Sequence, residues 1–586
     1  MNMKNVVGLI AMGVALFLGG CSTLLSSKVT GKEWVAEATE SVQITHDKPQ
    51  PRVFKSAVRQ VYFAKDSTLM VRNSESGKES LIYKAPPGVQ LSSISTYADS
   101  QYFYVAWRPK MFTNIAEMGR FGDKMVFVAR SQDGEAFGAP SRVSSSNGAF
   151  SPTITGNGAG DVYVVWQDER NGSAFDLYSN VSHDYANTWK AADVRLDFNA
   201  PGETFSAEPA LMAEGNNVWL AWTESRKVAG PFSIHIRASN DAGETWSAPQ
   251  VAATSTSAPF FPRVLLGKDK LYLYWFSDQG VGGAWSDDNG LTWKQFEAGG
   301  IASKVRNLLT RVDRQGVIHM VYSTMGEGGK YSNLYYINSA NGIDFSPAIR
   351  LNSDGAEFSY SAMLANLDFD ASNNILATWM DFRFFRPVSM GRFSADQGKT
   401  WGPNFLLDRG ADVSASQFPV VIANGNEWWV SLMRYQKANL ISGQAVLATV
   451  DTKNMPDSAR FASPSSMEDL RQRATLWWQS RLDKNWSQSY DLLDPLMRAK
   501  NKKEGYIRSQ GTSVYHAFEV IGAELTDARR ARVRVKYTAE VPDVMIGAKL
   551  VNIPKKEMET DQEWIFIDGN WFLLFKDIYG NTFLEQ

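Results

Sequence analysis

Charged side chains gather directly after several apolar segments that end in an aromatic residue. Carboxylates can act as general acids or bases, and guanidinium groups bind carboxylates and phosphates through paired hydrogen bonds. Together these two chemistries suit the binding of an anion or acid–base chemistry on a bound ligand. The residues concerned are Asp168, Asp381, Arg170, Arg226, Arg383 and Arg434.

The same residues also have a structural interpretation. Exposed Asp–Arg pairs hold loops together and contribute only about 0–1 kcal/mol each. We expect this loop-fixing role to be the main one, and the sequence leaves the chemical role open beside it.

Two further arginines lie at the start of apolar segments. When these segments are aligned on a proline that begins several of them, Arg263 and Arg306 take equivalent positions, where other segments have small or apolar residues. A poorly solvated guanidinium group without a counter-charge is costly, so each arginine needs a carboxylate partner or an anionic ligand. Asp278 and Glu327 are the expected internal partners, and both outcomes remain open.

Other reaction chemistries lack their motifs. The five histidines are scattered, and the sequence has no H-E-x-x-H metal motif, G-x-S-x-G elbow, phosphate-binding loop or dinucleotide fingerprint. We therefore expect neither a metal nor a cofactor. The formal net charge of -2 and the lack of a long basic run argue against nucleic acid as a partner.

A repeated octapeptide indicates which elements carry these residues. Its Ser, Asp, Thr and Trp recur at fixed positions, and successive copies begin 47 to 57 residues apart. That period is typical of one four-stranded propeller blade. The close copies are Ser182–Trp189, Ser239–Trp246, Ser286–Trp293 and Ser394–Trp401, and weaker copies begin at Ser131 and Ser339.

These repeats resemble the S-x-D-x-G-x-T-W Asp boxes of the sialidase-like superfamily, over roughly residues 58 to 452. The resemblance implies an all-β propeller in which the box lies on the face opposite the ligand. We expect the box residues to be architectural, because Ser and Asp side chains satisfy backbone N–H groups in a turn. Counting strand pairs favours seven blades, with six as the alternative, and strands from 58 to 85 are expected to complete the seventh.

The resemblance also implies a set of catalytic residues. Exo-sialidases bind the substrate carboxylate with three arginines, use an Asp as acid and base, and attack with a Tyr that a Glu activates. The F-R-I-P sequence that supplies the first arginine in that family is missing here. The residues that could match are Arg263, Arg306 and Arg434 for the arginines, Tyr360 and Glu357 for the nucleophile and its activator, and Asp168 or Asp381 for the acid.

The N-terminal residues predict export. An apolar stretch, Val6–Leu18, is too short to span a bilayer comfortably and is followed by Gly19-Gly20-Cys21. This order resembles a bacterial lipoprotein signal, which implies a signal peptide over residues 1–20 and acylation of Cys21; an ordinary secretory signal is the alternative. Ser22 resembles the sorting pattern of Gram-negative lipoproteins, so we expect a lipid anchor in the cell outer membrane.

The rest of the chain divides by composition. Residues 21–50 are polar and are expected to form a tether, and residues 51–463 are expected to form the propeller. Residues 464–586 predict an α+β domain, with a helix that contains Trp477 and Trp478 and a hairpin that turns at Asp568-Gly569-Asn570. This order of helices and strands resembles the nuclear-transport-factor-like cone fold.

Two classes of function follow from these observations. The first is a non-catalytic envelope scaffold whose propeller binds an anionic glycan, a peptide or a partner protein. The second is an exo-sialidase-type glycoside hydrolase that acts outside the cytoplasm. Arginines paired with carboxylates favour the scaffold, and an arginine cluster beside a Tyr/Glu pair favours the enzyme. The candidate ligand-binding residues are Arg263, Arg306, Arg170, Arg226, Arg383 and Arg434.

Overall fold

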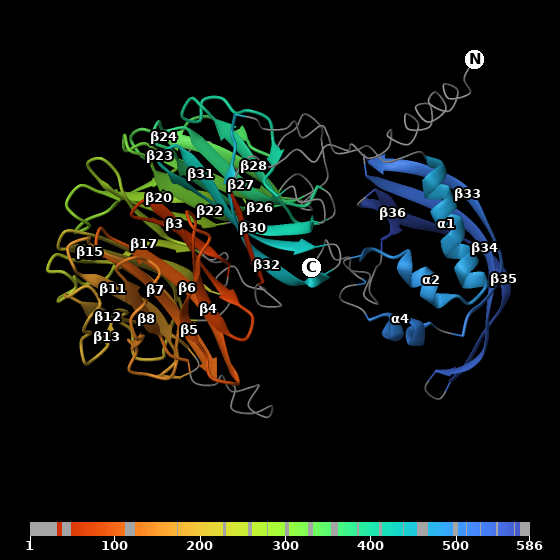
Figure 1. Cartoon of the computed structure of the whole chain (residues 1–586), viewed down its shortest axis with the longest axis horizontal. Coiled ribbons are helices and arrows are strands. Elements are labelled where there is room, and N and C mark those ends of the chain that lie inside the picture. Colours follow the sequence, from red (N-terminus) through yellow and green to blue (C-terminus); the bar gives the residue numbers. More distant parts are fainter. Residues whose placement is uncertain are drawn as a thin grey trace, which may run out of the picture.

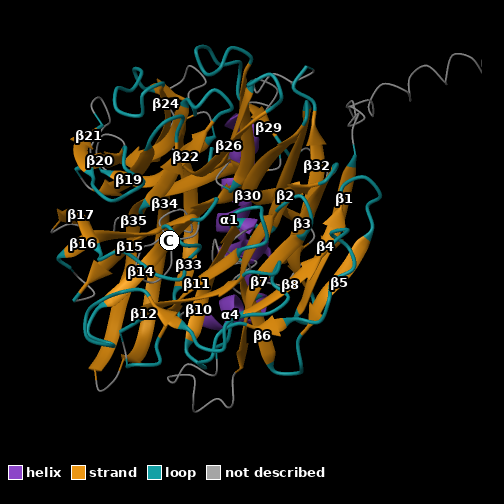
Figure 2. Ribbon diagram, turned by 90° about the vertical axis from the view of Figure 1, so that its left-hand side faces the viewer, coloured by secondary structure: helices purple, strands orange, loops and turns teal. Residues whose placement is uncertain are grey.

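Strands make up most of the molecule, and the helices belong to its C-terminal part (Figures 1 and 2). The computed structural model describes residues 32–37, 48–111, 124–453 and 467–574, apart from short gaps at 173, 227–229, 256–260, 278, 299–303, 326–331, 353–360, 384–385, 409–412, 437–438, 496–497, 499–501, 511, 528, 547–548 and 568. The predicted acylation site Cys21 lies outside the described residues.

Eight four-stranded antiparallel sheets, here called blades 1 to 8, follow one another along the chain. Their first strands are β2 (Gln50–Phe54), β6 (Val89–Ala98), β10 (Ala149–Gly156), β14 (Phe205–Glu214), β18 (Arg263–Leu266), β22 (Val305–Val312), β26 (Ala362–Phe369) and β30 (Val413–Asn424). Their second strands are β3 (Ala57–Ala64), β7 (Phe103–Met111), β11 (Val162–Asp168), β15 (Asn217–Ser225), β19 (Leu271–Ser277), β23 (Ile318–Met325), β27 (Ile375–Asp381) and β31 (Glu427–Gln436).

The outer strands complete each blade in the same order. The third strands are β4 (Thr68–Asn73), β8 (Phe127–Ser131), β12 (Asp176–Ser182), β16 (Phe232–Ser239), β20 (Gly280–Ser286), β24 (Ser332–Ser339), β28 (Val388–Ser394) and β32 (Asn439–Val450). The fourth strands are β5 (Glu79–Lys84), β9 (Ser141–Arg142), β13 (Val194–Arg195), β17 (Gln250–Ser255), β21 (Lys294–Glu297), β25 (Ile349–Arg350), β29 (Phe405–Leu406) and, for blade 8, β1 (Glu33–Glu37).

The blades form a closed ring. Each first strand contacts the first strand of the next blade, and β30 contacts β2. The fold is therefore an all-β propeller, as expected, but the prediction of seven blades, with six as the alternative, is wrong because eight sheets take part. The strands between 58 and 85 belong with β2 to a blade of their own and do not complete the last one.

The strand that completes blade 8 comes from the N-terminal side of the chain. β1 pairs with β32 from Glu33↔Ala448 to Glu37↔Gln444. The indole N–H of Trp34 donates to the carbonyl of Ser74 (2.9 Å), which attaches β1 to blade 1 as well. The expectation that residues 21–50 are a tether throughout is thus wrong for residues 33–37.

The second strands supply the core. Every residue of β11 is buried, because both faces of a blade pack against neighbouring blades. The largest fully buried side chains include the second-strand tryptophans Trp107, Trp166, Trp222 and Trp379. These tryptophans hold the charged residues that follow them at fixed positions on one rim of the ring.

The described residues of the C-terminal part form helices and one four-stranded sheet, and the expected α+β composition is confirmed. It contains α1 (Met467–Leu482), α2 (Trp486–Asp491), α4 (Lys503–Ser509) and the strands β33 (Val514–Asp527), β34 (Arg530–Ile546), β35 (Lys549–Ile567) and β36 (Asn570–Leu573). The predicted hairpin closes through the pair Ile567↔Asn570. Trp477 and Trp478 are buried against the sheet in the core of this part.

Candidate functional site

The Asp boxes lie between the third and fourth strands of their blades. Ser239 Oγ donates to Asp241 (2.8 Å) and accepts the N–H of Gly243 (2.9 Å), and Asp241 accepts the N–H of Thr245 (2.9 Å). Gly243 has a φ of 84°, and Ala186 adopts the same left-handed conformation (φ 60°) in the copy without glycine. All these bonds stay within one turn, so the boxes are architectural, as the sequence predicted.

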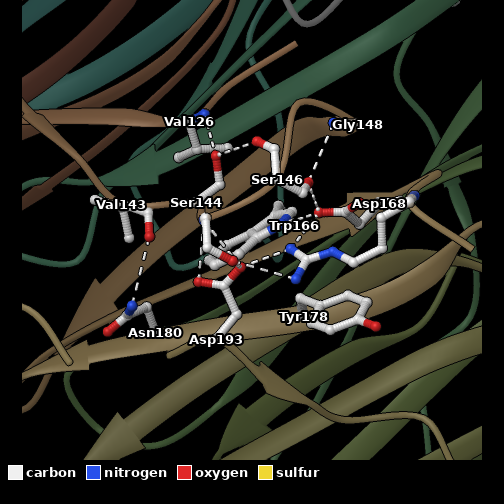
Figure 3. A network of polar contacts seen from close by, with 12 residues as sticks. Val126, Val143, Ser144, Ser146, Gly148, Trp166, Asp168, Tyr178, Asn180 and Asp193 are labelled. Atoms are coloured by element: carbon white, nitrogen blue, oxygen red, sulfur yellow. Dashed lines mark hydrogen bonds and ion pairs between the residues drawn. The ribbon is translucent and has the colours of Figure 1, made fainter. Parts of the chain in front are cut away.

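Asp168 ends β11 and is completely buried. Its Oδ2 accepts hydrogen bonds from the indole of Trp166 (2.9 Å), from Ser146 Oγ (2.6 Å) and from Arg170 Nη2 (2.7 Å), and Arg170 also bonds to Asp193 (2.6 Å). Figure 3 shows Trp166, Ser146 and Asp193 around this carboxylate. Burial alone would raise the pKa of Asp168, but these hydrogen bonds lower it. Asp168 is therefore an ionised anchor of its loop.

The same Trp-x-Asp-x-Arg arrangement recurs in blade 7. The carboxylate of Asp381 is fully buried, accepts the indole N–H of Trp379 (2.9 Å), and is bound through both oxygens by Arg383 (3.0 Å each). These carboxylates and arginines, which the sequence offered as acids and ligand-binding groups, thus bind one another.

Blade 4 departs from this arrangement. Glu224 takes the place of the aspartate, and the indole of Trp222 lies 3.4 Å from its Oε2. The side chain of Arg226 is 71% exposed, and its one ion pair with a described residue is with Glu203, at 3.4 Å. Arg226 is therefore a surface residue with a weak ion pair.

Arg434 joins blade 8 to the N-terminal strand. Its Nε and Nη2 donate to Asp408 (2.7–3.0 Å), and its Nη1 and Nη2 donate to Glu33 of β1 (2.8 and 2.9 Å). The guanidinium group is thus enclosed by two carboxylates. These contacts give Arg434 a role in ring closure, which the sequence did not suggest.

The eight first strands enclose the central channel that is typical of a propeller. Four cationic side chains on or next to three of these strands form what we call the cationic cluster: Lys48, Arg52, Arg263 and Arg311. Burial and the charges of Arg311 and Arg263 lower the pKa of Lys48 to about 8. Burial and the positive charge of Arg311 lower the pKa of Arg52 to about 10. Burial also lowers the pKa of Arg263, with a further contribution from Arg311.

Solvent reaches these side chains although protein surrounds them. Arg311 is exposed, and the other three members are half-buried. Burial nevertheless lowers the pKa of Arg311. A side chain that water can touch but that is poorly solvated is expected where it projects into a channel through the protein, since solvent then reaches it only through the channel.

The cluster has few protein partners. Arg263 and Arg311 each donate to a neighbouring backbone carbonyl, that of Pro262 (2.8 Å) and that of Thr310 (3.2 Å), and Arg52 donates to Thr96 Oγ1 (3.1 Å). Among the described residues, none of the four cations has a carboxylate oxygen within 4.0 Å, and Lys48 makes no hydrogen bond. Most of the N–H groups of these four side chains are therefore available to donate hydrogen bonds to a ligand.

Two carboxylates lie farther from the cluster. The charge of Glu208 opposes the lowering of the Arg263 pKa, and that of Asp368 acts in the same way on Arg311. Asp368 accepts the N–H of Ala423 (2.9 Å), and burial raises its pKa. Four cations and two carboxylates leave a net charge of +2 when all are ionised.

The structure changes the predicted set of channel arginines. Arg263 begins β18, as expected, but Arg306 lies where the register of β22 shifts between Val305 and Asn307. Arg311 is the arginine of β22 whose charge acts on Arg263. The sequence analysis did not single out Lys48, Arg52 or Arg311. Tyr360 and Glu357, the proposed nucleophile and activator, and Asp278 and Glu327, the proposed partners, lie outside the described residues.

No helix in the described part of the chain is long and apolar enough to cross a membrane, and no group of three or more His, Cys, Asp or Glu side chains there is placed to hold a metal ion.

Comparison with known proteins gives structural similarity only. No family model and no curated protein sequence matches the chain. Among solved structures, an ulvan lyase of a polysaccharide lyase family is 12% identical, with 62% of this chain and 95% of that chain covered and a TM-score of 0.40. A Hadza microbial sialidase is 14% identical (73% and 91% covered, TM-score 0.33), and the NanB sialidase from Streptococcus pneumoniae is 9% identical (72% and 93%, TM-score 0.33). Similarities this distant carry no argument about ligand or activity.

Proposed function

We propose that this protein is a binding module of the cell envelope whose propeller holds an anionic ligand at the cationic cluster. The observation that carries the proposal is that three cations of the cluster, Lys48, Arg263 and Arg311, have no carboxylate oxygen within 4.0 Å among the described residues. Unpaired, poorly solvated cations are costly, and an anionic ligand would offset that cost. Acylation of Cys21 would hold the module at the outer membrane, where acidic glycans, peptides and proteins are the available ligands.

The bonding of the two candidate acids supports binding over cleavage. Both oxygens of Asp168 and of Asp381 accept hydrogen bonds from neighbouring arginines and tryptophans. A general acid must bring a proton within hydrogen-bonding distance of the leaving group, and these carboxylates are already engaged. They therefore serve the propeller better as anchors than as catalysts.

Equilibrium binding of acidic and neutral oligosaccharides tests the proposal. The full-length chain, purified in detergent, is titrated with 3′-sialyllactose and oligogalacturonate, with lactose as the neutral reference. We expect binding of at least one acidic sugar and a loss of roughly 100-fold or more in the Arg263→Gln/Arg311→Gln variant, because two charge-assisted contacts are removed. The Arg534→Gln variant, in the C-terminal sheet, is the matched control.

The sialidase alternative has its own assay. Release of 4-methylumbelliferone from its sialic acid glycoside is measured for the same proteins over a broad pH range. We expect no turnover. Turnover that disappears in the Arg263→Gln/Arg311→Gln variant would replace the binding proposal with the enzyme.

A further inference from the structure

We propose that the cationic cluster takes a tetrahedral dianion, a phosphoryl or sulfate group, in preference to a single carboxylate. This inference rests on the proposed function, because it specifies the ligand chemistry of the same channel. The expected sialidase-type site differs from it, since that site would hold one planar carboxylate.

The charge of the channel favours a doubly charged group. The four cations and the two nearby carboxylates, Glu208 and Asp368, sum to +2 when all are ionised. A monoanion would leave one positive charge uncompensated in a poorly solvated place, whereas a dianion balances the set.

The positions of the donors favour a tetrahedral group over a planar one. A carboxylate has two oxygens in one plane, and a single guanidinium group can satisfy both. Arg52, Arg263 and Arg311 belong to blades 1, 5 and 6 of an eight-membered ring, so they approach the channel from different sides. Three guanidinium groups from different directions match oxygens that point to the corners of a tetrahedron.

Arg311 is the centre of the cluster. It is the one member whose charge acts on each of the other three. It is also the exposed member, so its donors are open to a ligand from the channel. An anion that binds Arg311 therefore lies within electrostatic reach of Lys48, Arg52 and Arg263 as well.

Lys48 links this binding to pH. With a pKa of about 8, its ammonium group begins to lose its proton just above neutral pH. A bound dianion stabilises the charged form and so raises the pKa of Lys48. Binding must then take up protons near pH 8 and weaken as the pH rises further.

Isothermal titration of the full-length chain in detergent tests this inference, with sulfate, inorganic phosphate and acetate as probes at constant ionic strength. Sulfate stays a dianion between pH 6.5 and 9.5, so changes in its affinity report the protein. We expect sulfate and phosphate to bind at least about tenfold more tightly than acetate at pH 7, and Arg311→Gln to remove this binding. Sulfate affinity should fall between pH 8 and 9.5, and Lys48→Arg should abolish that fall.

Three results would contradict this inference. Equal affinity for sulfate and acetate, lost in Arg311→Gln, would overturn the dianion preference and leave the proposed function standing. If none of the three probes and none of the acidic sugars binds, both the dianion preference and the proposed function are overturned. Sulfate binding that survives Arg311→Gln would place the anion elsewhere. Lys78→Gln, at an exposed lysine that pairs with Glu135, is the matched control for Lys48, and thermal unfolding verifies that each variant is folded.

Discussion

Asp288 shows what a single box residue contributes. It accepts hydrogen bonds from the N–H and the hydroxyl of Thr292 and from Ser286. The hydrogen bond from the Thr292 hydroxyl is the main reason that the pKa of Asp288 is lowered to about 2. An unfolded aspartate titrates near about 3.9. The stabilisation is therefore present above about pH 4 and is lost as the pH falls toward about 2.

We expect Asp288→Asn to lower stability by about 1–2 kcal/mol at pH 7, because the amide cannot accept all of these hydrogen bonds. The difference from the unchanged protein should shrink toward zero at pH 2. Thermal unfolding by circular dichroism at a series of pH values measures it. The neighbouring Asp287→Asn is the control, since Asp287 is about half exposed and its ion pair is with the exposed Lys294. Equal effects of the two substitutions would contradict the architectural role of the box.

Asp197 has the opposite pH dependence. It is buried beside Asp176 and Arg195, and accepts a hydrogen bond from Ser206 (3.0 Å). Burial and the charge of Asp176 raise the pKa of Asp197 to about 7. The folded state therefore keeps a proton that the unfolded state loses, so stability falls as the pH rises from about 4 to about 7.

Asp197→Asn should remove this loss, because an amide can donate to Asp176 without titrating. We expect the variant to match the unchanged protein at pH 4.5 and to unfold at a higher temperature at pH 8. Melting temperatures at both values decide the question. A variant that is less stable at pH 8 would show that the Asp197 carboxylate is ionised and paired with Arg195.

At the scale of the element, the Trp-x-Asp-x-Arg arrangement fixes the loop that follows a second strand. In Arg383→Ala, the buried Asp381 would lose its counter-charge, which typically costs about 3–5 kcal/mol. Arg226→Ala removes the corresponding arginine of blade 4, which is exposed, so we expect a change within about 0.5 kcal/mol. Unfolding curves of the two variants, side by side, separate the buried pair from the surface pair. Similar curves would refute the anchoring role.

The elements were predicted from sequence where the signals were local. The Asp boxes recur every 47 to 57 residues, with a tryptophan-containing strand before most of them, so the strand order within a blade could be read directly. Alignment on the proline could not identify the channel residues. The register of β22 shifts between Val305 and Asn307, so positions counted from the start of this strand are displaced. Counting back from the hairpins would have found two of them. Arg52 lies two residues before the pair Phe54↔Ala57, and Arg311 lies two residues before Asp313, which bonds across its turn to Val317.

At the scale of the whole molecule, the number of blades depended on pairing between distant segments. Residues 33–37 carry no turn motif that indicates pairing with β32. The pairing of β1 with β32 depends on closure of the whole ring. The seven-blade count therefore failed at the one blade whose strands come from both ends of the propeller. Local sequence patterns cannot indicate which distant edge a short strand will cover.

The ring closure can be tested through Arg434. Arg434→Ala leaves Asp408 without its buried partner and releases Glu33 of β1. We expect a lower melting temperature and faster tryptic cleavage after Lys32, which precedes β1. Limited proteolysis followed by N-terminal sequencing measures this rate, and Arg534→Ala in the C-terminal sheet serves as the control. Unchanged cleavage after Lys32 would show that Arg434 does not hold the closing strand.

The closing strand also sets the order of events during biosynthesis. The backbone N–H of Lys32 donates to Thr449 Oγ1, and 417 residues separate the two partners. At about 5–20 residues per second, a ribosome needs roughly 20–80 s to make that interval. Throughout this time β1 has been synthesised but its partner strand has not, so blade 8 cannot be completed before β32 emerges. Any factor that keeps this chain from aggregating has to act until the last blade emerges.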